Sequence, residues 1–239
     1  MTKQTQQGAA FERVSSGRTH VGKVRPTNQD AILALDASGL WVVADGMGGY
    51  RDGDVASRMV CEALADLSAG ATLDESIAAV RTRLQAVNLK LYKAATRVFD
   101  PVVSGSTVAV LAMHDDQCAA IWAGDSRVYR LRARQLDRLT TDHTIAAQLN
   151  LQSDEAAHHA ITRAVGGDGR LVLDVHRDRI ERGDRYLLCT DGLTHEVGDT
   201  RIAELLAEGD PATCADALIE SALAEGGRDN VSVIVVDVR

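Results

Sequence analysis

The most regular pattern in the chain is a short, largely apolar run with an aspartate at one tip. Apolar runs that are bounded by turn residues predict buried β-strands. The runs and their aspartates are Leu40–Ala44 before Asp45, Cys118–Ala123 before Gly124-Asp125, Tyr186–Thr190 before Asp191, and 231–236 after Asp229. Each of these predicted strands therefore brings a carboxylate to one of its ends.

Further strands follow from the same patterning. We predict a first strand over Val14–Val24, and a hairpin in which Ala31–Leu35 and Leu40–Ala44 flank the turn at 36–39. The other predicted strands are Thr107–Met113, Arg127–Leu131, Leu136–Leu139, Leu171–Val175 and Val231–Val238. Turns are expected at 115–116 and 133–134.

Helical spacing appears in two parts of the chain. A helix is predicted from Val55 to Leu67, and a second one after the capping box Thr72–Glu75. The apolar stripe of the second helix runs from Ile77 to Val98, about three heptads, and a helix lying on a sheet is favoured over a coiled coil. Two more helices are predicted, over 200–207 and after an Asp210 N-cap.

The order of these elements predicts the fold class. Strands, two helices, a block of strands, further helices and a final strand lack the βαβ alternation of a parallel sheet. We expect an α+β fold in which antiparallel sheets carry helices on their outer faces. Residues 1–10 are expected to form a flexible tail and 11–239 a single domain. The Ala-, His- and Gln-rich stretch from Asp142 to about Ala164 is expected to be a partly helical flap.

Composition narrows the possible partners. The 239 residues are 45% hydrophobic but only 3% aromatic, so aliphatic side chains must fill the core. The net charge of -8 argues against a nucleic-acid or anionic-membrane binder. No apolar run approaches the roughly 20 residues that span a bilayer, and the polar N-terminus lacks a signal-peptide core. We expect a cytoplasmic protein.

The cysteines and tryptophans are expected to be core residues. Four cysteines are widely separated and form no C-x-x-C pair, which argues against a zinc knuckle or a redox motif. In apolar surroundings a free cysteine behaves as a small hydrophobe. Trp41 and Trp122 each lie in a predicted strand, where core packing is favoured over stacking on a substrate.

The acidic tips are the candidate chemistry. Unpaired buried carboxylates are unfavourable, and several of them meeting around hard divalent cations would be neutralised and would form a catalytic centre. In 45–49 a carboxylate precedes three glycines in four positions, which leaves backbone carbonyls accessible. Taken alone, this stretch also fits a tight turn with a surface Asp45.

Arg25 ends the first predicted strand near these acids. Its planar guanidinium suits a phosphate group, but a salt bridge with a neighbouring aspartate fits equally well, and spacing alone leaves both interpretations open. The small residues Ser104–Thr107 lack the lysine and spacing of a phosphate-binding loop, so we interpret them as the start of a strand near the site.

Six motifs in order are similar to those of a known family. They are Arg25…Asn28-Gln29-Asp30, Val43-Ala44-Asp45-Gly46-Met47-Gly48-Gly49, Ser104-Gly105-Ser106-Thr107, Ala123-Gly124-Asp125-Ser126-Arg127, Thr190-Asp191-Gly192-Leu193 and Arg228-Asp229-Asn230-Val231. Together they resemble the metal-dependent serine/threonine protein phosphatases of type 2C, the PPM family, and most of all its short bacterial members. The resemblance covers about residues 13–238.

The resemblance implies an αββα sandwich with two Mn²⁺ or Mg²⁺ ions at one end, and extends to a third ion. Asp45 would bridge the two ions, Gly46 would offer its carbonyl to one, and Asp191 and Asp229 would complete the other. It also implies that Asp125 would bind the third metal and that Asp30 would hold metal-bound water from outside the ligand shell. Arg25 would bind the substrate phosphate, and residues of about 142–167 would form a flap beside the active site. A metal-activated water would attack phosphorus without a covalent intermediate.

The chain departs from parts of the family in the residues after the Asp-Gly. Some members have a histidine at the position of Met47, and this histidine is proposed to protonate the leaving group. Bacterial members often have methionine there, as this chain does. A metal-bound water or a flap residue such as His143 is left as the general acid. Tyr50 stands where bacterial relatives usually have histidine, and His158-His159 are expected on the flap surface.

The implied function is hydrolysis of phosphoserine and phosphothreonine in proteins. The implied partners are phosphorylated proteins and a cognate Ser/Thr kinase, and we expect a monomer. Two alternatives are a phosphatase of an anti-sigma-antagonist phosphoprotein and a non-catalytic phosphopeptide-binding pseudophosphatase. Loss of a bridging aspartate would favour the latter, and none is lost. The arginines of 127–138 are interpreted as a solvated face, with docking of acidic phosphopeptides as the alternative.

Overall fold

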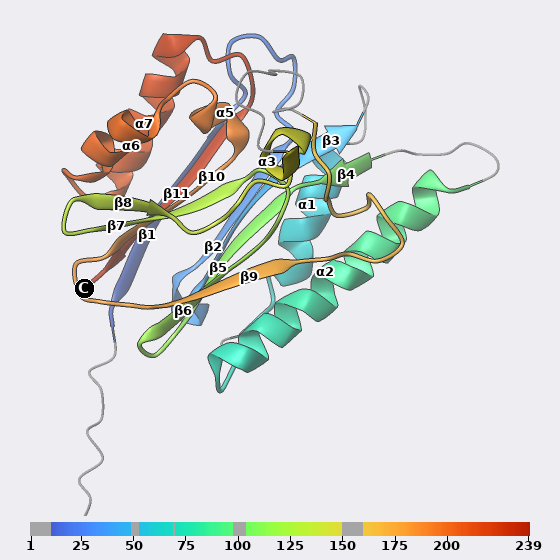
Figure 1. Cartoon of the computed structure of the whole chain (residues 1–239), viewed down its shortest axis with the longest axis horizontal. Helices are drawn as coiled ribbons and strands as arrows, with labels where there is room; N and C mark the ends of the chain where they lie inside the picture. The colour runs from blue at the N-terminus through green and yellow to red at the C-terminus, as the bar shows by residue number, and fades with distance from the viewer. Residues whose placement is uncertain (1–10, 49–52, 69, 98–103, 150–159) are drawn as a thin grey trace, which may run out of the picture.

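The protein is a sandwich of two antiparallel β-sheets between two layers of helices, as expected for an α+β chain (Figure 1). The computed structural model describes residues 11–48, 53–68, 70–97, 104–149 and 160–239. The first sheet has the order β1 (Arg13–His20), β11 (Val231–Val238), β10 (Arg185–Cys189), β7 (Arg127–Arg132) and β8 (Gln135–Arg138). The second has the order β2 (Asp30–Leu35), β3 (Leu40–Gly48), β5 (Val108–His114), β6 (Gln117–Ala123) and β9 (Asp174–Arg179), with β4 (Ser104–Ser106) paired to β3.

Helices cover the outer face of each sheet. α1 (Gly53–Leu64) and α2 (Leu73–Ala95) pack on the second sheet, and α6 (Asp199–Leu206) and α7 (Pro211–Glu225) pack on the first. The shorter elements are the 3₁₀ turn η1 (Asp36–Ser38), α3 (Ile145–Leu149) and α5 (Asp191–Thr194). In the described part of the chain, no helix is both long and apolar enough to cross a membrane.

The central strands β3, β5, β6, β10 and β11 are apolar at consecutive positions because both of their faces are buried. Successive side chains of a strand point to opposite faces. On β3, Trp41 and Val43 lie between the sheets, whereas Leu40 and Val42 face α1 and α2. On β10, Tyr186 and Leu188 lie between the sheets and the alternate residues face α6 and α7. Burial on both sides removes the polar alternation of a half-exposed sheet.

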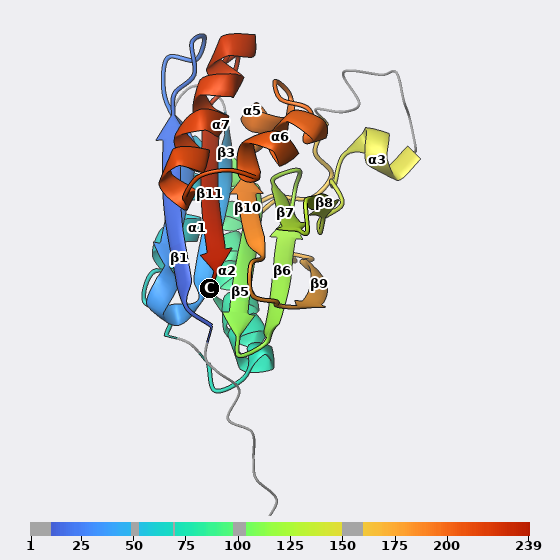
Figure 2. The ribbon, with the colours of Figure 1, turned by 90° about the vertical axis from the view of Figure 1, so that its left-hand side faces the viewer.

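Strand register brings the acidic tips to one end of the sandwich. β11 runs antiparallel to both β1 and β10, so its start lies beside their ends. Arg127 pairs with Cys189, and Asp30 pairs with Asp45, which places the β6–β7 turn and the end of β3 at the same end. Figure 2 shows this end at the top, away from the C-terminus.

Most predicted elements are confirmed. The hairpin forms around η1, with Gly39 in the left-handed region at φ 63°. The Thr72 hydroxyl accepts from the Glu75 N–H at 3.2 Å at the start of α2, and Asp210 caps α7. α2 lies on the second sheet, as favoured over a coiled coil. All four cysteines are free and buried, and both tryptophans are buried.

Several strand boundaries differ from the prediction. β3 continues to Gly48 instead of ending at Ala44. β1 ends at His20 because the chain turns at Gly22, where φ is +81° and a Cβ would lie 2.2 Å from the Asp229 carbonyl oxygen. The predicted strand at Leu171–Val175 begins only at Asp174. The N–H of Leu171 donates to the Gln85 Oε1 at 3.1 Å, so the chain follows α2 before it joins the sheet. Tyr50, His158-His159 and the tail predicted over residues 1–10 lie outside the described residues.

Candidate metal centre

The seven predicted site residues lie at one end of the sandwich, on six elements and loops. Asp45 and Gly46 are in β3, Asp30 begins β2, Asp125 lies in the β6–β7 turn, Asp191 begins α5, and Arg25 and Asp229 lie in loops next to β1 and β11. Asp45 is close enough to Asp30, Asp191 and Asp125 for each carboxylate to raise its pKa. Residues that are far apart in the sequence therefore form one acidic cluster.

Asp30 is held by two hydroxyl groups that sequence patterning did not single out. The Thr190 hydroxyl donates to Asp30 Oδ2 at 2.9 Å, and the Ser232 hydroxyl donates to the same oxygen at 2.7 Å. Burial raises the pKa of Asp30 to about 7, against the effect of both hydroxyls. A signal was present, because Ser232 is a polar residue in the otherwise apolar run 231–236.

Backbone contacts fix the position of Asp45. Its N–H donates to the Thr107 hydroxyl at 3.0 Å, and its carbonyl accepts from the Thr107 N–H at 2.8 Å. The Thr107 hydroxyl also lies 2.7 Å from that of Ser126, next to Asp125. Burial raises the pKa of the Asp45 carboxyl well above its usual range, with further upward effects from Asp30 and Asp191. The buried carboxylates of the cluster therefore favour binding of a cation.

Gly46 is required by the close approach of α1. A Cβ at this position would lie 2.0 Å from the carbonyl oxygen of Gly53 and 2.6 Å from that of Gln29. No side chain fits at either distance, so glycine alone allows the end of β3 to pack against the start of α1. This packing holds the Asp45-Gly46 backbone in place beside the acidic cluster.

Three carboxylate oxygens in the cluster are buried without a partner. They are Oδ1 of Asp30, Oδ1 of Asp125 and Oδ1 of Asp191, and none has a hydrogen-bond donor among the described residues. Burial raises the pKa of Asp125 to about 8, with a further upward effect from Asp191. Unsatisfied buried carboxylate oxygens are unfavourable, and hard divalent cations prefer such ligands. The donor set therefore fits divalent metal ions.

The carboxylates do not form a closed cage. Within the residues that the structure describes, no group of three or more His, Cys, Asp or Glu side chains is placed to hold an ion on its own. They approach one another in pairs, such as Asp30 beside Asp45 in the strand register and Asp191 beside Asp45. Hard cations that keep several waters need only a few protein oxygens each.

Arg25 pairs with the predicted ligand Asp229. Its Nη2 donates to Asp229 Oδ2 at 2.7 Å, while 56% of the arginine side chain stays exposed. This hydrogen bond raises the pKa of Arg25. Both interpretations of Arg25 thus remain compatible: the guanidinium pairs with a carboxylate and still presents donors to solvent at the edge of the cluster.

Asn230 anchors the loop that carries Arg25. Its side-chain oxygen accepts from the Gln29 N–H at 2.8 Å. Its amide nitrogen donates to the carbonyl oxygens of Val21 and Thr27, each at 2.9 Å. One buried side chain thus ties both ends of the loop to the residue after Asp229. Like Ser232 and Thr190, it is a positioning residue.

His143 has a structural role at the start of the segment that we predicted to be a flap. The ring is buried and stacks on Trp122, with 5.9 Å between ring centroids. Nδ1 accepts from the Gly124 N–H at 3.2 Å, and Nε2 lies 3.1 Å from Asp174 Oδ2. Burial lowers the pKa of His143. Because Nδ1 accepts from the Gly124 N–H, the neutral ring carries its proton on Nε2. These contacts oppose a role as general acid and tie the flap to the turn that carries Asp125.

We expect His143→Ala to destabilise the protein more than it slows the reaction. It would leave the Gly124 N–H without a partner and remove the His143 contact of Asp174, which keeps its ion pair with Arg163. We expect a loss of about 2–3 kcal/mol of unfolding free energy, whereas kcat at saturating metal should fall less than about tenfold. Urea unfolding and a pH–rate profile measure the two effects, with the exposed His176→Ala as control. A fall above about 100-fold, with the alkaline limb lost and stability kept, would identify a general acid instead.

The arginines of 127–138 are largely engaged within the protein. Arg127 pairs with Asp142 at 2.7 Å, Arg132 pairs with Asp184 at 2.7 Å, and Arg130 pairs with Asp137 and Asp178. The structure supports an ion-paired face here rather than a docking site. Arg134 is an exception, because it forms no ion pair with any residue that the structure describes.

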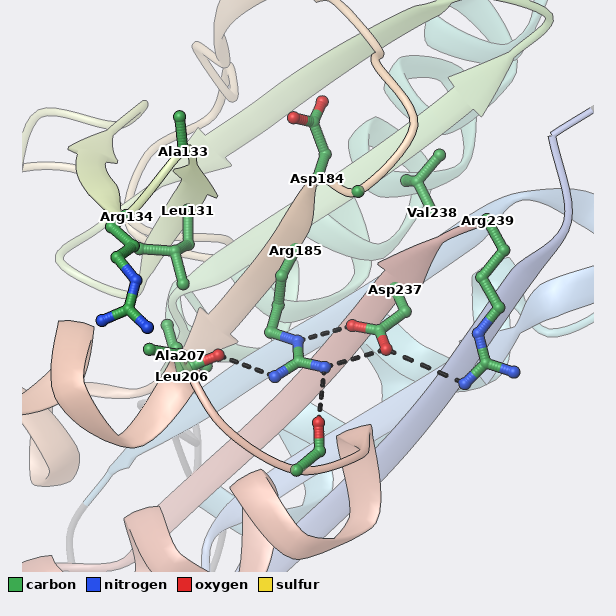
Figure 3. A pocket seen from close by; sticks show the side chains of 12 residues that line it. Leu131, Ala133, Arg134, Asp184, Arg185, Leu206, Ala207, Asp237, Val238 and Arg239 are labelled. Carbon is green, nitrogen blue, oxygen red and sulfur yellow. Dashed lines mark hydrogen bonds and ion pairs between the residues drawn. The ribbon is translucent and has the colours of Figure 1, made fainter.

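The hollow beside Arg134 lies away from the acidic cluster. This pocket of about 350 Å³ is formed by the end of β7, the start of β10 and the end of β11 (Figure 3). The metal candidates lie at the opposite ends of β10 and β11. Arg185 on its floor is satisfied by Asp237 at 2.5 Å and by the carbonyl oxygens of Leu206 and Gly209. We assign no chemistry to this pocket.

Comparison with known proteins is consistent with the site. The model of the family "protein phosphatase 2C" matches residues 16–222. The serine/threonine phosphatase stp of Listeria monocytogenes is 33% identical over 236 residues, covering 92% of this chain and 94% of that protein. PstP of Mycobacterium tuberculosis is 35% identical over 232 residues, which cover 93% of this chain and 44% of PstP.

Solved structures match almost the whole chain. PppA, described as a key regulatory component of T6SS in Pseudomonas aeruginosa, superposes with a TM-score of 0.91 at 36% identity, covering 96% of this chain and 99% of PppA. The catalytic domain of PstP, in complex with two manganese ions, superposes with a TM-score of 0.86 at 35% identity, covering 95% and 99%. The predicted αββα sandwich is confirmed by these neighbours.

Proposed function

The chain belongs to the protein phosphatase 2C family and is a serine/threonine phosphatase, and we propose that the acidic cluster at the end of its sandwich is the catalytic metal centre. The observation that carries this proposal is the set of three buried carboxylate oxygens, on Asp30, Asp125 and Asp191, without a partner in the described chain. The metals are two Mn²⁺ or Mg²⁺ ions. The structure of the PstP catalytic domain contains two manganese ions.

Each residue of the cluster has a distinct proposed task. Asp45, the Gly46 carbonyl, Asp191 and Asp229 would hold the two metal ions, and Asp125 would hold a third ion. Asp30 is fixed by Thr190 and Ser232 through one oxygen, which leaves its Oδ1 free to orient water beside Asp45. When bound, the ions supply Lewis acidity and activate water as the nucleophile.

Arg25 is the proposed ligand of the substrate phosphate. Its fork has five donors, and the structure shows one of them on Asp229. The others can reach phosphate oxygens at the exposed edge of the cluster, where they orient the phosphoryl group and balance its charge. Asn230 holds the loop so that this arginine stays next to the metal ligands.

The wider setting follows from the chemistry of the site. We infer that the substrates are phosphorylated proteins and that a cognate Ser/Thr kinase makes them, with residues 11–239 forming one monomeric catalytic domain. The four free, buried thiols suit a reducing compartment such as the cytoplasm. The intact acidic set favours an enzyme over a phosphopeptide-binding pseudophosphatase.

The test is metal-dependent release of phosphate. Purified protein should hydrolyse a phosphothreonine peptide and p-nitrophenyl phosphate with Mn²⁺, and a chelator should abolish the activity. Binding of Mn²⁺ should also raise the unfolding temperature, because the ions bind only the folded cluster. Hydrolysis that persists in chelator, or an unfolding temperature that Mn²⁺ leaves unchanged, would contradict a metal centre at this position.

A further inference from the structure

Two hollows adjoin the chain segment that enters β9. The first, of about 530 Å³, lies between Met47 and the segment 161–172. The second, of about 550 Å³, lies between the same segment and Arg81, Thr82 and Gln85 of α2. Both are lined by 170–172, so we name them together the α2 groove. It begins at Met47, two residues after Asp45.

The segment that lines both hollows forms a wall of the groove, and this wall is fixed to α2. The Asn88 side chain donates to the Asp168 carbonyl oxygen at 2.9 Å and accepts from the Gly166 N–H at 2.7 Å. Gln85 accepts from the Leu171 N–H at 3.1 Å. Asn88 is fully buried, so it holds the wall from inside the protein. The groove is therefore preformed, and a ligand would not have to order this wall on binding.

The groove carries unpaired positive charge. Arg81 and Arg170 are both exposed, and neither forms an ion pair with a residue that the structure describes. Arg163, also in the lining, is already paired with Asp174 at 2.9 Å. Among the described lining residues the acidic one is Asp168, whose Oδ1 accepts from the Gly169 N–H at 2.5 Å. In a chain with a net charge of -8, a patch with two free guanidinium groups stands out.

An exposed apolar residue lines the groove together with the two arginines. Val172 is 51% exposed and lines both hollows, next to Arg170. A guanidinium beside an exposed aliphatic side chain suits a peptide that presents both carboxylate and apolar groups. The groove starts at Met47, two residues along β3 from Asp45 of the proposed metal centre, so one peptide can reach from the centre into the groove.

We propose that the α2 groove binds an acidic segment of the phosphoprotein substrate, next to its phosphoserine or phosphothreonine. Arg81 and Arg170 contact carboxylates of this segment and Val172 contacts an apolar side chain. The proposal rests on the proposed function and names a determinant of its specificity. Preference for acidic flanking sequences would then come from a surface outside the metal centre.

Two matched phosphothreonine peptides test the proposal. One carries Asp and Glu on both sides of the phosphothreonine, and the other carries Asn and Gln at the same positions. The variants are the double substitution Arg81→Gln/Arg170→Gln and the control Arg134→Gln, which removes another exposed arginine at the far end of the sandwich. kcat/KM is measured on both peptides and on p-nitrophenyl phosphate, and fluorescence anisotropy in chelator measures peptide binding without turnover.

We expect the wild type to prefer the acidic peptide by about tenfold, through KM and with weakening by salt. The double variant should lose this preference in both assays and keep its rate on p-nitrophenyl phosphate, and Arg134→Gln should behave as wild type. Equal binding of both peptides by the wild type, or equal losses on both peptides in the double variant, would overturn the proposal. Absence of all Mn²⁺-dependent turnover would reject the proposed function instead, and anisotropy would still decide the groove.

Discussion

Replacing Asp191 with asparagine should lower kcat at least about 10³-fold in saturating Mn²⁺, the largest effect that we expect from a single substitution. Asp191 lies beside Asp45 and has a buried oxygen without a partner in the described chain. Asparagine keeps the shape of the side chain but removes the charge that a divalent cation needs. Affinity for Mn²⁺ should fall together with activity.

Folding is a separate readout for Asp191→Asn. The cluster contains several mutually repelling carboxylates, so removing one charge should leave the metal-free protein as stable as the wild type or more so. Calorimetry with and without Mn²⁺ tests this, and the rise in unfolding temperature with metal should shrink. The control is Asp116→Asn, because Asp116 forms an exposed pair with Arg179 at 3.6 Å. Near-wild-type turnover in Asp191→Asn would remove Asp191 from the metal centre.

Arg25→Ala should lower kcat/KM by about 100-fold and weaken inhibition by inorganic phosphate about tenfold. The side chain is half-exposed next to Asp229, so its loss should cost under about 1 kcal/mol of stability. Arg25→Lys should recover only part of the activity, because an ammonium group lacks the planar fork. Steady-state kinetics with phosphate as the competing ligand give both values.

The control for Arg25 is another ion-paired arginine that is close to it in the sequence. Arg18 on β1 donates to Asp216 at 2.5 Å, away from the acidic cluster. Arg18→Ala should leave kinetics and phosphate inhibition unchanged. If Arg25→Ala lost activity through weaker metal binding and kept its affinity for phosphate, the guanidinium would serve only as the partner of Asp229.

Patterning predicted the parts of the fold that depend on local sequence. The hairpin around Asp36–Ser38, the capping box at Thr72 and the final strand follow from turn residues, N-caps and apolar runs, which act over a few residues. The acidic residues of the site were also visible, because an aspartate at the tip of a buried strand is conspicuous against apolar neighbours.

The contacts that position those aspartates were not predicted. Thr190 and Ser232 reach Asp30 across 160 and 202 residues of sequence, and this depends on the register of β2, β10 and β11. The role of His143 depends likewise on β9, which supplies Asp174, and on the turn that supplies Gly124. The predicted strand at Leu171–Val175 was wrong for its first three residues, because tertiary contacts with α2 override local preference there.

The pairing of β1 with β11 joins the two extremes of the described chain, since Arg13 lies opposite Val238. β11 also separates β1 from β10 in the first sheet. During synthesis this sheet must therefore wait for the last strand to leave the ribosome, and closing so long a loop makes folding slow. A chain cut short before Val231 would leave two open sheet edges and would be prone to aggregate.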